Sequence, residues 1–170
     1  METGFLGIAT YHPLFFEYRY NSLPERIKLT SEELGLMSLF QNISGATARD
    51  CILDPKMDRV IFVVSPGEMG LAIGKGGATI KNVQQTIGKS VELVEWAEEP
   101  RQFIMNALNA QLVSEVRVTE RPDGTRTATV VVDQRRKGAV LGKEGRNAEK
   151  ARLLAKRYFD VETIHIVTAQ

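Results

Sequence analysis

The chain has 170 residues, of which 43% are hydrophobic and 25% are charged, and its formal net charge at pH 7 is +1. This composition is typical of a folded globular protein, and no run approaches the roughly 20 apolar residues of a membrane-spanning helix, so collagen-like, coiled-coil and membrane-spanning chains are excluded. One cysteine and two histidines exclude an intramolecular disulfide and argue against a zinc site, so we expect a cytoplasmic protein that needs no metal or cofactor.

Residues 1–28 are expected to form an N-terminal extension that is loosely attached to the rest of the chain. They contain six of the chain's twelve aromatic residues and match no part of the sequence that follows. The folded part of the chain is therefore expected to begin at residue 29.

Residues 29–98 are predicted to form a first domain of mixed helices and strands. Thr30 and Glu33 have the spacing of a capping box, in which each side chain accepts a hydrogen bond from the other residue's backbone N–H, so a helix begins there. Apolar runs and turn residues then indicate two strands, two helices divided by a glycine-rich turn, and a last strand. The predicted elements are a helix from Thr30 to Ile43, strands at 49–53 and 60–64, helices at 68–73 and 78–87, and a strand at 90–96.

An internal repeat extends this order to the remainder of the chain. When the chain is aligned with itself, Gly70, Gly74, Lys75 and Gly77 fall on Gly138, Gly142, Lys143 and Gly145 at one constant offset. The repeat predicts a second domain at 99–170, with helices at 100–109, 137–141 and 146–158 and strands at 113–120, 126–132 and 161–167. Residues 97–99 are too few for a free linker, and Trp96 is expected to pack at the joint. The expected fold is α+β, with two αββααβ domains packed as one rigid unit.

Each domain contains a Gly-x-x-Gly turn between two helices, at residues 74–77 and 142–145. Glycine adopts backbone angles that are closed to other residues, and the helix that follows directs unpaired N–H groups toward the turn. Such an arrangement attracts phosphate. Neither a P-loop nor a dinucleotide-binding fingerprint fits, because Met69 and Thr79 stand where those motifs need glycine.

A Gly-x-x-Gly turn between two helices, within the order αββααβ, resembles the KH domain in its type II topology. Two such domains in a chain this short are similar to the archaeal NusA-like transcription termination and antitermination proteins, and the resemblance covers residues 30–168. It implies that each turn binds the backbone of about four nucleotides of single-stranded RNA while the bases lie on an apolar groove. It also implies a role in transcription termination or antitermination without enzymatic activity, and RNA polymerase as a possible partner.

The residues assigned to RNA are those of the two turns and the apolar or basic residues next to them. They are Ile73, Gly74, Lys75, Gly76, Gly77 and Lys81 in the first domain, and Arg135, Arg136, Lys137, Leu141, Gly142, Lys143, Glu144, Gly145, Arg146 and Lys150 in the second. Cations at a helix start oppose the helix dipole, so the placement of residues 135–137 favours a use in phosphate contact. Glu144 departs from the pattern because it places a carboxylate beside the expected phosphate. Ile73, Ile80 and Leu141 fit either the base groove or the core, and their helical spacing favours the core.

Charge is divided unevenly between the domains. Residues 31–98 carry a net charge of −3 and residues 99–170 a net charge of +4. The positive excess suits a polyanion, although a solvated helix face has the same appearance. Two alternatives stay open: a ribosomal or ribosome-assembly KH protein, and a protein-interaction module whose turns no longer bind RNA. The aromatic residues of the extension could stack on RNA bases. We expect the protein to be a monomer with no membrane partner.

Overall fold

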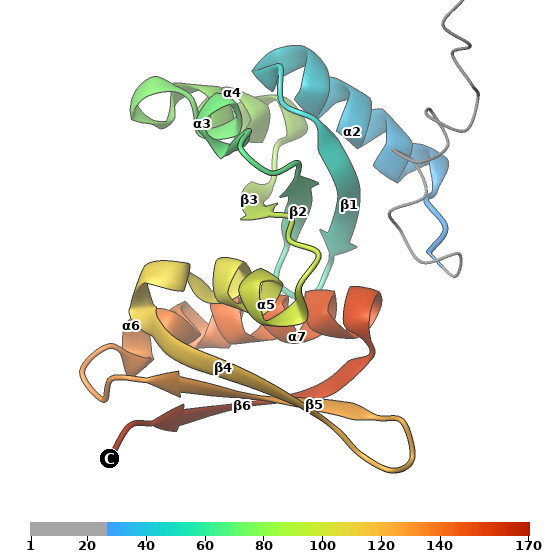
Figure 1. Cartoon of the computed structure of the whole chain (residues 1–170). Coiled ribbons are helices and arrows are strands. Elements are labelled where there is room, and N and C mark those ends of the chain that lie inside the picture. Colours follow the sequence, from blue (N-terminus) through green and yellow to red (C-terminus); the bar gives the residue numbers. More distant parts are fainter. Residues whose placement is uncertain (1–26) are drawn as a thin grey trace, which may run out of the picture.

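The structure, a computed structural model, describes residues 27–170, so residues 1–26 of the expected extension lie outside the described part. The described residues form two units, one above the other in Figure 1, and each unit has a three-stranded sheet with its own helices on one face. The predicted order αββααβ is present twice, which confirms the α+β fold.

The first unit begins with the predicted capping box. The Glu33 backbone N–H donates to Thr30 Oγ1 at 3.2 Å, and the Thr30 N–H donates to Glu33 Oε2 at 2.7 Å, which satisfies two N–H groups at the helix start. The elements of this unit are α2 (Ser31–Ser44), β1 (Ala48–Asp54), β2 (Arg59–Val64), α3 (Met69–Ile73), the short 3-10 turn η1 (Lys75–Gly77), α4 (Ala78–Ile87) and β3 (Ser90–Glu95).

The second unit repeats this order and adds a 3-10 turn before its first strand. In each sheet the first two strands are antiparallel and the third is parallel to the central strand. The elements are α5 (Pro100–Leu108), η2 (Ala110–Leu112), β4 (Val113–Glu120), β5 (Arg126–Val132), α6 (Lys137–Leu141), η3 (Lys143–Gly145), α7 (Arg146–Phe159) and β6 (Val161–Thr168).

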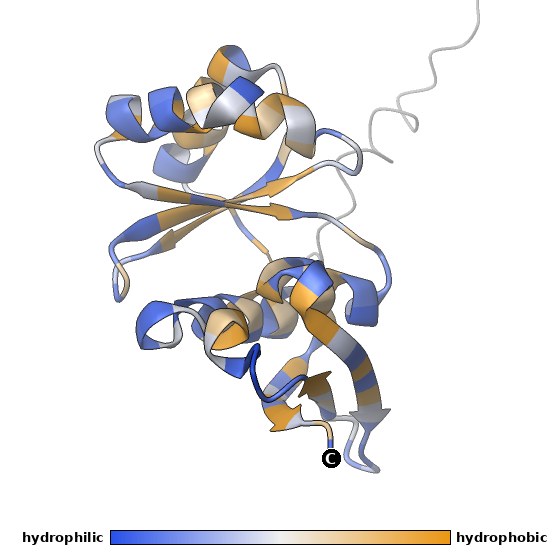
Figure 2. Ribbon diagram, turned by 90° about the vertical axis from the view of Figure 1, so that its left-hand side faces the viewer, coloured by the Kyte–Doolittle hydropathy of each residue, from blue (hydrophilic) through white to orange (hydrophobic). Residues whose placement is uncertain are grey.

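The first sheet is covered on both faces. Along β2, Val60, Phe62 and Val64 are buried in the core beneath the unit's own helices, whereas Ile61 and Val63 are buried in a second core that includes residues of α5 and α7. Figure 2 shows this sheet between two layers of helices. A strand buried on both faces reads as a continuous apolar run, and this is why residues 60–64 do not alternate.

The second sheet is covered on one face only. Ala128 and Val130 of β5 are buried, but Thr129 between them is half-exposed. Arg117 on β4 and His165 on β6 pair with Thr129 in register and are both exposed, so they form a polar row across the outer face. The two sheets therefore share a topology but differ in what covers them.

Aromatic side chains fill the joint between the units. Trp96 follows β3, and its ring lies 5.3 Å from that of Phe103 on α5 and 5.1 Å from that of Tyr158 on α7, measured between centroids. The Arg49 guanidinium lies 4.8 Å from the centroid of Trp96, within cation–π distance. Trp96 thus packs at the joint, as its position in the sequence predicts.

A buried carboxylate also crosses the joint. Asp50 on β1 has no exposed surface, and it accepts hydrogen bonds from Arg157 Nε at 2.7 Å and Nη2 at 3.1 Å, and from the Tyr158 hydroxyl. Burial, together with the nearby Asp50 carboxylate, raises the pKa of Tyr158, so its hydroxyl keeps the proton that it donates. The joint therefore combines apolar packing with a polar link from the first sheet to α7.

Candidate nucleic-acid interface

The two Gly-x-x-Gly turns have nearly identical backbones. Gly74 has φ 73° and ψ 170°, and Gly142 has φ 74° and ψ 168°. In each turn the N–H of the last glycine donates to the carbonyl of the first at 3.1 Å. Since a positive φ combined with an extended ψ is a region that glycine alone adopts readily, the first glycine of each turn is required by the backbone itself.

The first glycine of each turn also lacks space for a side chain. A Cβ at Gly74 would lie 2.1 Å from Thr79 Oγ1 and 2.8 Å from the Thr79 backbone nitrogen. At Gly142 the same atom would lie 2.9 Å from Asn147 Cγ. The chain thus closes tightly over the first glycine and brings the start of the next helix to the turn.

Replacing Gly74 with alanine is expected to lower the free energy of unfolding by about 3 kcal/mol, since it adds both backbone strain and a contact with backbone that cannot rotate away. Gly76 is the matched control, because it has φ 61° but nothing within 4 Å of its Cβ position. Its replacement by alanine should cost about 1 kcal/mol. Urea denaturation compares the two variants, and equal losses would contradict the close packing at Gly74.

The helices that follow the turns begin without a side-chain cap. Among the described helices, α2 has its capping box, whereas no side chain accepts a hydrogen bond at the starts of α4 and α7. Lys75 and Gly76 in the first turn and Lys143 in the second are exposed. Uncapped N–H groups and a lysine at the same turn suit a phosphate group, which accepts hydrogen bonds and carries negative charge.

Glu144 makes the second turn different from the first. It occupies the position of Gly76 and takes the same left-handed conformation, with φ 56° against 61°. A non-glycine residue in this region costs roughly 1–2 kcal/mol. Its exposed carboxylate also lies in the turn itself. The second turn therefore keeps the shape of the first at some cost and with an added negative charge.

Apolar side chains next to the first turn are exposed. Ile73 is 41% exposed and Leu71, on the same short helix α3, is 55% exposed. The core assignment that helical spacing favours is thus wrong for Ile73, whereas Ile80 packs against the core and Leu141 is half-buried. The sequence does not identify Leu71 as an exposed apolar residue, because its helix is too short for hydrophobic periodicity to show which face is exposed to solvent.

The basic residues 135–137 lie at the entry to α6 in the second unit. Arg135 and Arg136 are exposed, and Arg136 Nη1 donates to the Gln111 carbonyl at 3.3 Å. The equivalent entry in the first unit carries Glu68, whose Oε2 accepts from the Thr47 N–H at 2.5 Å. The positive charge at this entry is therefore a property of the second unit alone.

Changing Arg135, Arg136 and Lys137 to glutamine is expected to flatten the salt dependence of RNA binding. For single strands, log K falls with log salt by about 0.7 per phosphate neutralised, so the slope should decrease by up to about 2 units. The control replaces Arg117, Arg121 and Arg126, which belong to the β4–β5 hairpin, and the turn of this hairpin lies at the opposite end of the sheet from α6 (Figure 1). Titrations at several salt concentrations measure the slope for each variant. If the two variants have equal slopes, residues 135–137 are solvated charges that do not contact phosphate.

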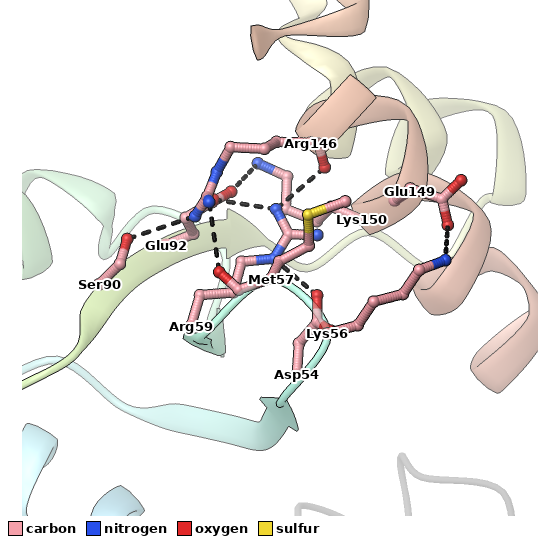
Figure 3. A network of polar contacts seen from close by, with 9 residues as sticks. All are labelled: Asp54, Lys56, Met57, Arg59, Ser90, Glu92, Arg146, Glu149 and Lys150. Atoms are coloured by element: carbon pink, nitrogen blue, oxygen red, sulfur yellow. Dashed lines mark hydrogen bonds and ion pairs between the residues drawn. The ribbon is translucent and has the colours of Figure 1, made fainter. Parts of the chain in front are cut away.

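Arg146 and Lys150 were assigned to RNA, but the structure gives their charges another partner. Glu92 on β3 of the first unit accepts from Arg146 Nη2 at 3.3 Å, and its Oε2 lies 2.8 Å from Lys150 Nζ (Figure 3). Lys150 is 9% exposed, so it is buried in the joint and cannot reach a phosphate in solvent. The assignment of Lys150 is therefore corrected to a structural one. Lys81, by contrast, is exposed on α4.

Sequence reasoning missed the acceptor at the centre of this network. Burial raises the pKa of Glu92, but Lys150 and Arg59 lower it by more, so the pKa is held below its usual value of 4.5. Arg59 is buried and donates to Glu92 Oε1 at 3.0 Å and to Asp54 Oδ2 at 2.8 Å. The only signal in the sequence was an arginine at the start of a strand that is otherwise wholly apolar.

Metal-binding clusters and membrane-spanning helices are both absent from residues 27–170. These residues include no group of three or more His, Cys, Asp or Glu side chains that could hold a metal ion. Within the same range, no helix has the length and apolar character needed to cross a membrane.

Comparisons with known proteins agree on both units. A family model for the KH domain matches residues 36–97, and a model for the NusA-like second KH domain matches residues 100–169. The chain is 41% identical over 140 residues to the probable transcription termination protein NusA of Halobacterium salinarum, an alignment that covers 82% of this chain and 98% of that protein. It is 31% identical to the protein of the same description from Methanocaldococcus jannaschii, covering 84% and 76% of the two chains. A solved structure described as the crystal structure of APE1850 is similar, with a TM-score of 0.73, 38% identity, and coverage of 82% of this chain and 100% of that one.

Proposed function

Because the chain belongs to the NusA-like family of proteins with two KH domains, we propose that it binds RNA and acts in transcription termination. In this proposal the two Gly-x-x-Gly turns each bind the backbone of a single-stranded RNA, and the protein binds rather than catalyses. RNA polymerase is the proposed protein partner. One copy of the chain carries both turns, so a monomer is sufficient.

The observation that carries the proposal is the same turn built twice. Gly74 and Gly142 have matching backbone angles, and each turn precedes a helix without a side-chain cap. A phosphate at either turn would lie at a helix start that has no side-chain cap, and near an exposed lysine. The apolar surface of Ile73 and Leu71 beside the first turn gives bases a place to lie out of water.

The two units are proposed to bind one strand together. Each turn accommodates about four nucleotides, so two turns would hold roughly eight or more. Because the units share a buried core, the second binding event occurs at a high effective concentration. The first unit supplies the turn without a carboxylate, and the second supplies the net positive charge.

The proposal is tested by crosslinking the protein to RNA in its own cells and sequencing the bound fragments. The control is a variant in which residues 75, 76, 143 and 144 are all aspartate, which places negative charge in both turns. We expect fragments enriched near the 3′ ends of transcripts, polymerase subunits in the same pull-down, and loss of the RNA fragments in the control. If the unmodified protein crosslinks to no more RNA than the aspartate variant does, RNA binding by the two turns is contradicted. Enrichment of ribosomal RNA without polymerase would favour the ribosomal alternative.

A further inference from the structure

We propose that Glu92 is a positioning residue for RNA: by holding Arg146 it fixes the second Gly-x-x-Gly turn at one distance and orientation from the first. This inference rests on the proposed function, because it concerns how one RNA strand reaches both turns.

Arg146 is anchored to the first unit through its backbone as well as its side chain. Arg59 Nη1 donates to the Arg146 carbonyl at 2.9 Å, and Arg146 Nη1 donates to the Met57 carbonyl at 3.3 Å. Arg146 is also the first residue of α7 and directly follows Gly145, the last residue of the turn. The second turn is therefore tied to the first unit by the residue next to its end, as Figure 3 shows.

Glu92 is the acceptor that the anchoring cations share. Its side chain is 19% exposed, and its two oxygens contact Arg59, Arg146 and Lys150. Without that negative charge, three cations would be left close together, and among residues 27–170 the remaining ion-pair partner is Asp54, which contacts Arg59. Like charges in a half-buried site repel strongly, so loss of Glu92 should release Arg146 and move the start of α7.

The first turn shows that these contacts are not needed to form a Gly-x-x-Gly turn. The repeat places Ala78 at the position of Arg146 and Asn82 at the position of Lys150, yet Gly74 and Gly142 have nearly the same backbone angles. The Glu92 network therefore adds something that the turn itself does not require. What it adds is a fixed relation between the second turn and the first unit.

A fixed relation between two binding sites has a measurable consequence. When two sites are held rigidly, affinity for a two-part ligand rises sharply at the spacer length that matches their separation. When one site is released, binding of the two-part ligand must also order that site, which lowers the affinity. The affinity then depends less sharply on spacer length. Binding of a ligand that occupies only one turn is unaffected in either case.

The experiment compares two RNA probes by fluorescence anisotropy. The first is a pool of random tetranucleotides, and the second joins two random tetranucleotides through polyethylene glycol spacers of increasing length. For the unmodified protein, the joined probe at its best spacer should bind about 100-fold more tightly than the single tetranucleotide. In Glu92→Gln the tetranucleotide affinity should be unchanged, the gain should fall by about tenfold, and the optimum should broaden.

Glu149→Gln is the matched control, because it removes one carboxylate that pairs with Lys56 and Arg152 instead of Arg146. It should keep the sharp optimum. Glu92→Asp keeps the negative charge in the joint, so the fold should be kept. Its shorter side chain cannot reach all three cations. This variant should therefore broaden the optimum in spacer length, as Glu92→Gln does.

Two results would overturn the inference. In one, both Glu92 variants are folded and keep the sharp optimum, so Glu92 is only structural. In the other, the Glu92 variants bind the single tetranucleotide more weakly by the same factor as the joined probe, so Glu92 acts on one turn alone. Failure of the proposed function is distinct from both, since the unmodified protein would then bind neither probe at low salt.

Discussion

Replacing Asp50 with asparagine is expected to lower the free energy of unfolding by about 3 kcal/mol, because a neutral amide cannot replace the buried carboxylate as the acceptor of the hydrogen bonds from Arg157 and Tyr158. The Asp50 carboxylate accepts from Arg157 and Tyr158 across the joint, and also from the backbone N–H of Cys51 at 2.8 Å. Asparagine has nearly the same volume, so the loss reflects charge and hydrogen bonding rather than packing. Urea denaturation followed by circular dichroism measures it.

Two further variants show what part of this loss is specific. Tyr158→Phe removes one hydrogen bond to a charged acceptor and should cost about 1.5 kcal/mol. Glu115→Gln changes a carboxylate that pairs with Arg117 on the exposed face of β4, and should leave the denaturation midpoint where it is. If Asp50→Asn behaved like Glu115→Gln, the buried pair would contribute no net stability to the joint.

Changing Lys75 and Gly76 to aspartate is expected to weaken binding of single-stranded RNA by about 100-fold, which corresponds to the loss of one or two charge-assisted hydrogen bonds. The new carboxylates would lie where we place the phosphate. Both positions are exposed, and nothing lies within 4 Å of the Cβ position of Gly76, so the fold should survive. Isothermal titration with a random single-stranded RNA pool measures the change.

The same change in the second turn, Lys143→Asp with Glu144→Asp, is expected to cost less than about tenfold, because this turn already holds a carboxylate and long-range attraction from nearby arginines remains. Screening weakens that attraction, so the first-turn variant should suffer relatively more at high salt. Each variant must first give the circular dichroism spectrum of the parent. A first-turn variant that binds RNA as well as the parent would remove residues 74–77 from the interface.

The sequence predicts the order of the elements well because its signals are local. The capping box at Thr30 and Glu33, the turn glycines and the constant offset between the two copies all depend on neighbours in the chain or on the repeat. The boundaries in the structure differ from the predicted ones by a residue or so at most ends, and the 3-10 turns at the Gly-x-x-Gly segments were not foreseen.

The joint could not be predicted in the same way, because its contacts lie far apart in the sequence. Asp50 and Arg157 are separated by 107 positions, and neither belongs to a periodic pattern that would connect them. Lys150 looked like one more cation beside the second turn, since its helical position gave no sign of Glu92 beneath it. A charged residue can be assigned to solvent or to a buried pair only when the tertiary partner is known.

The outer faces of the two sheets can be compared row by row. Ile52, Ile61 and Glu92 are paired across the first sheet, and the corresponding row of the second sheet consists of Arg117, Thr129 and His165.

The first row docks onto the helices of the following unit, which is a head-to-tail contact. A head-to-tail contact that recurs without closing a ring produces an open-ended filament. The polar row on the second sheet removes the surface that a third unit would need, just as the polar end repeats of solenoid proteins stop their growth. The second sheet therefore offers a third unit no counterpart of the apolar pair Ile52 and Ile61, so the same docking could not be repeated on it.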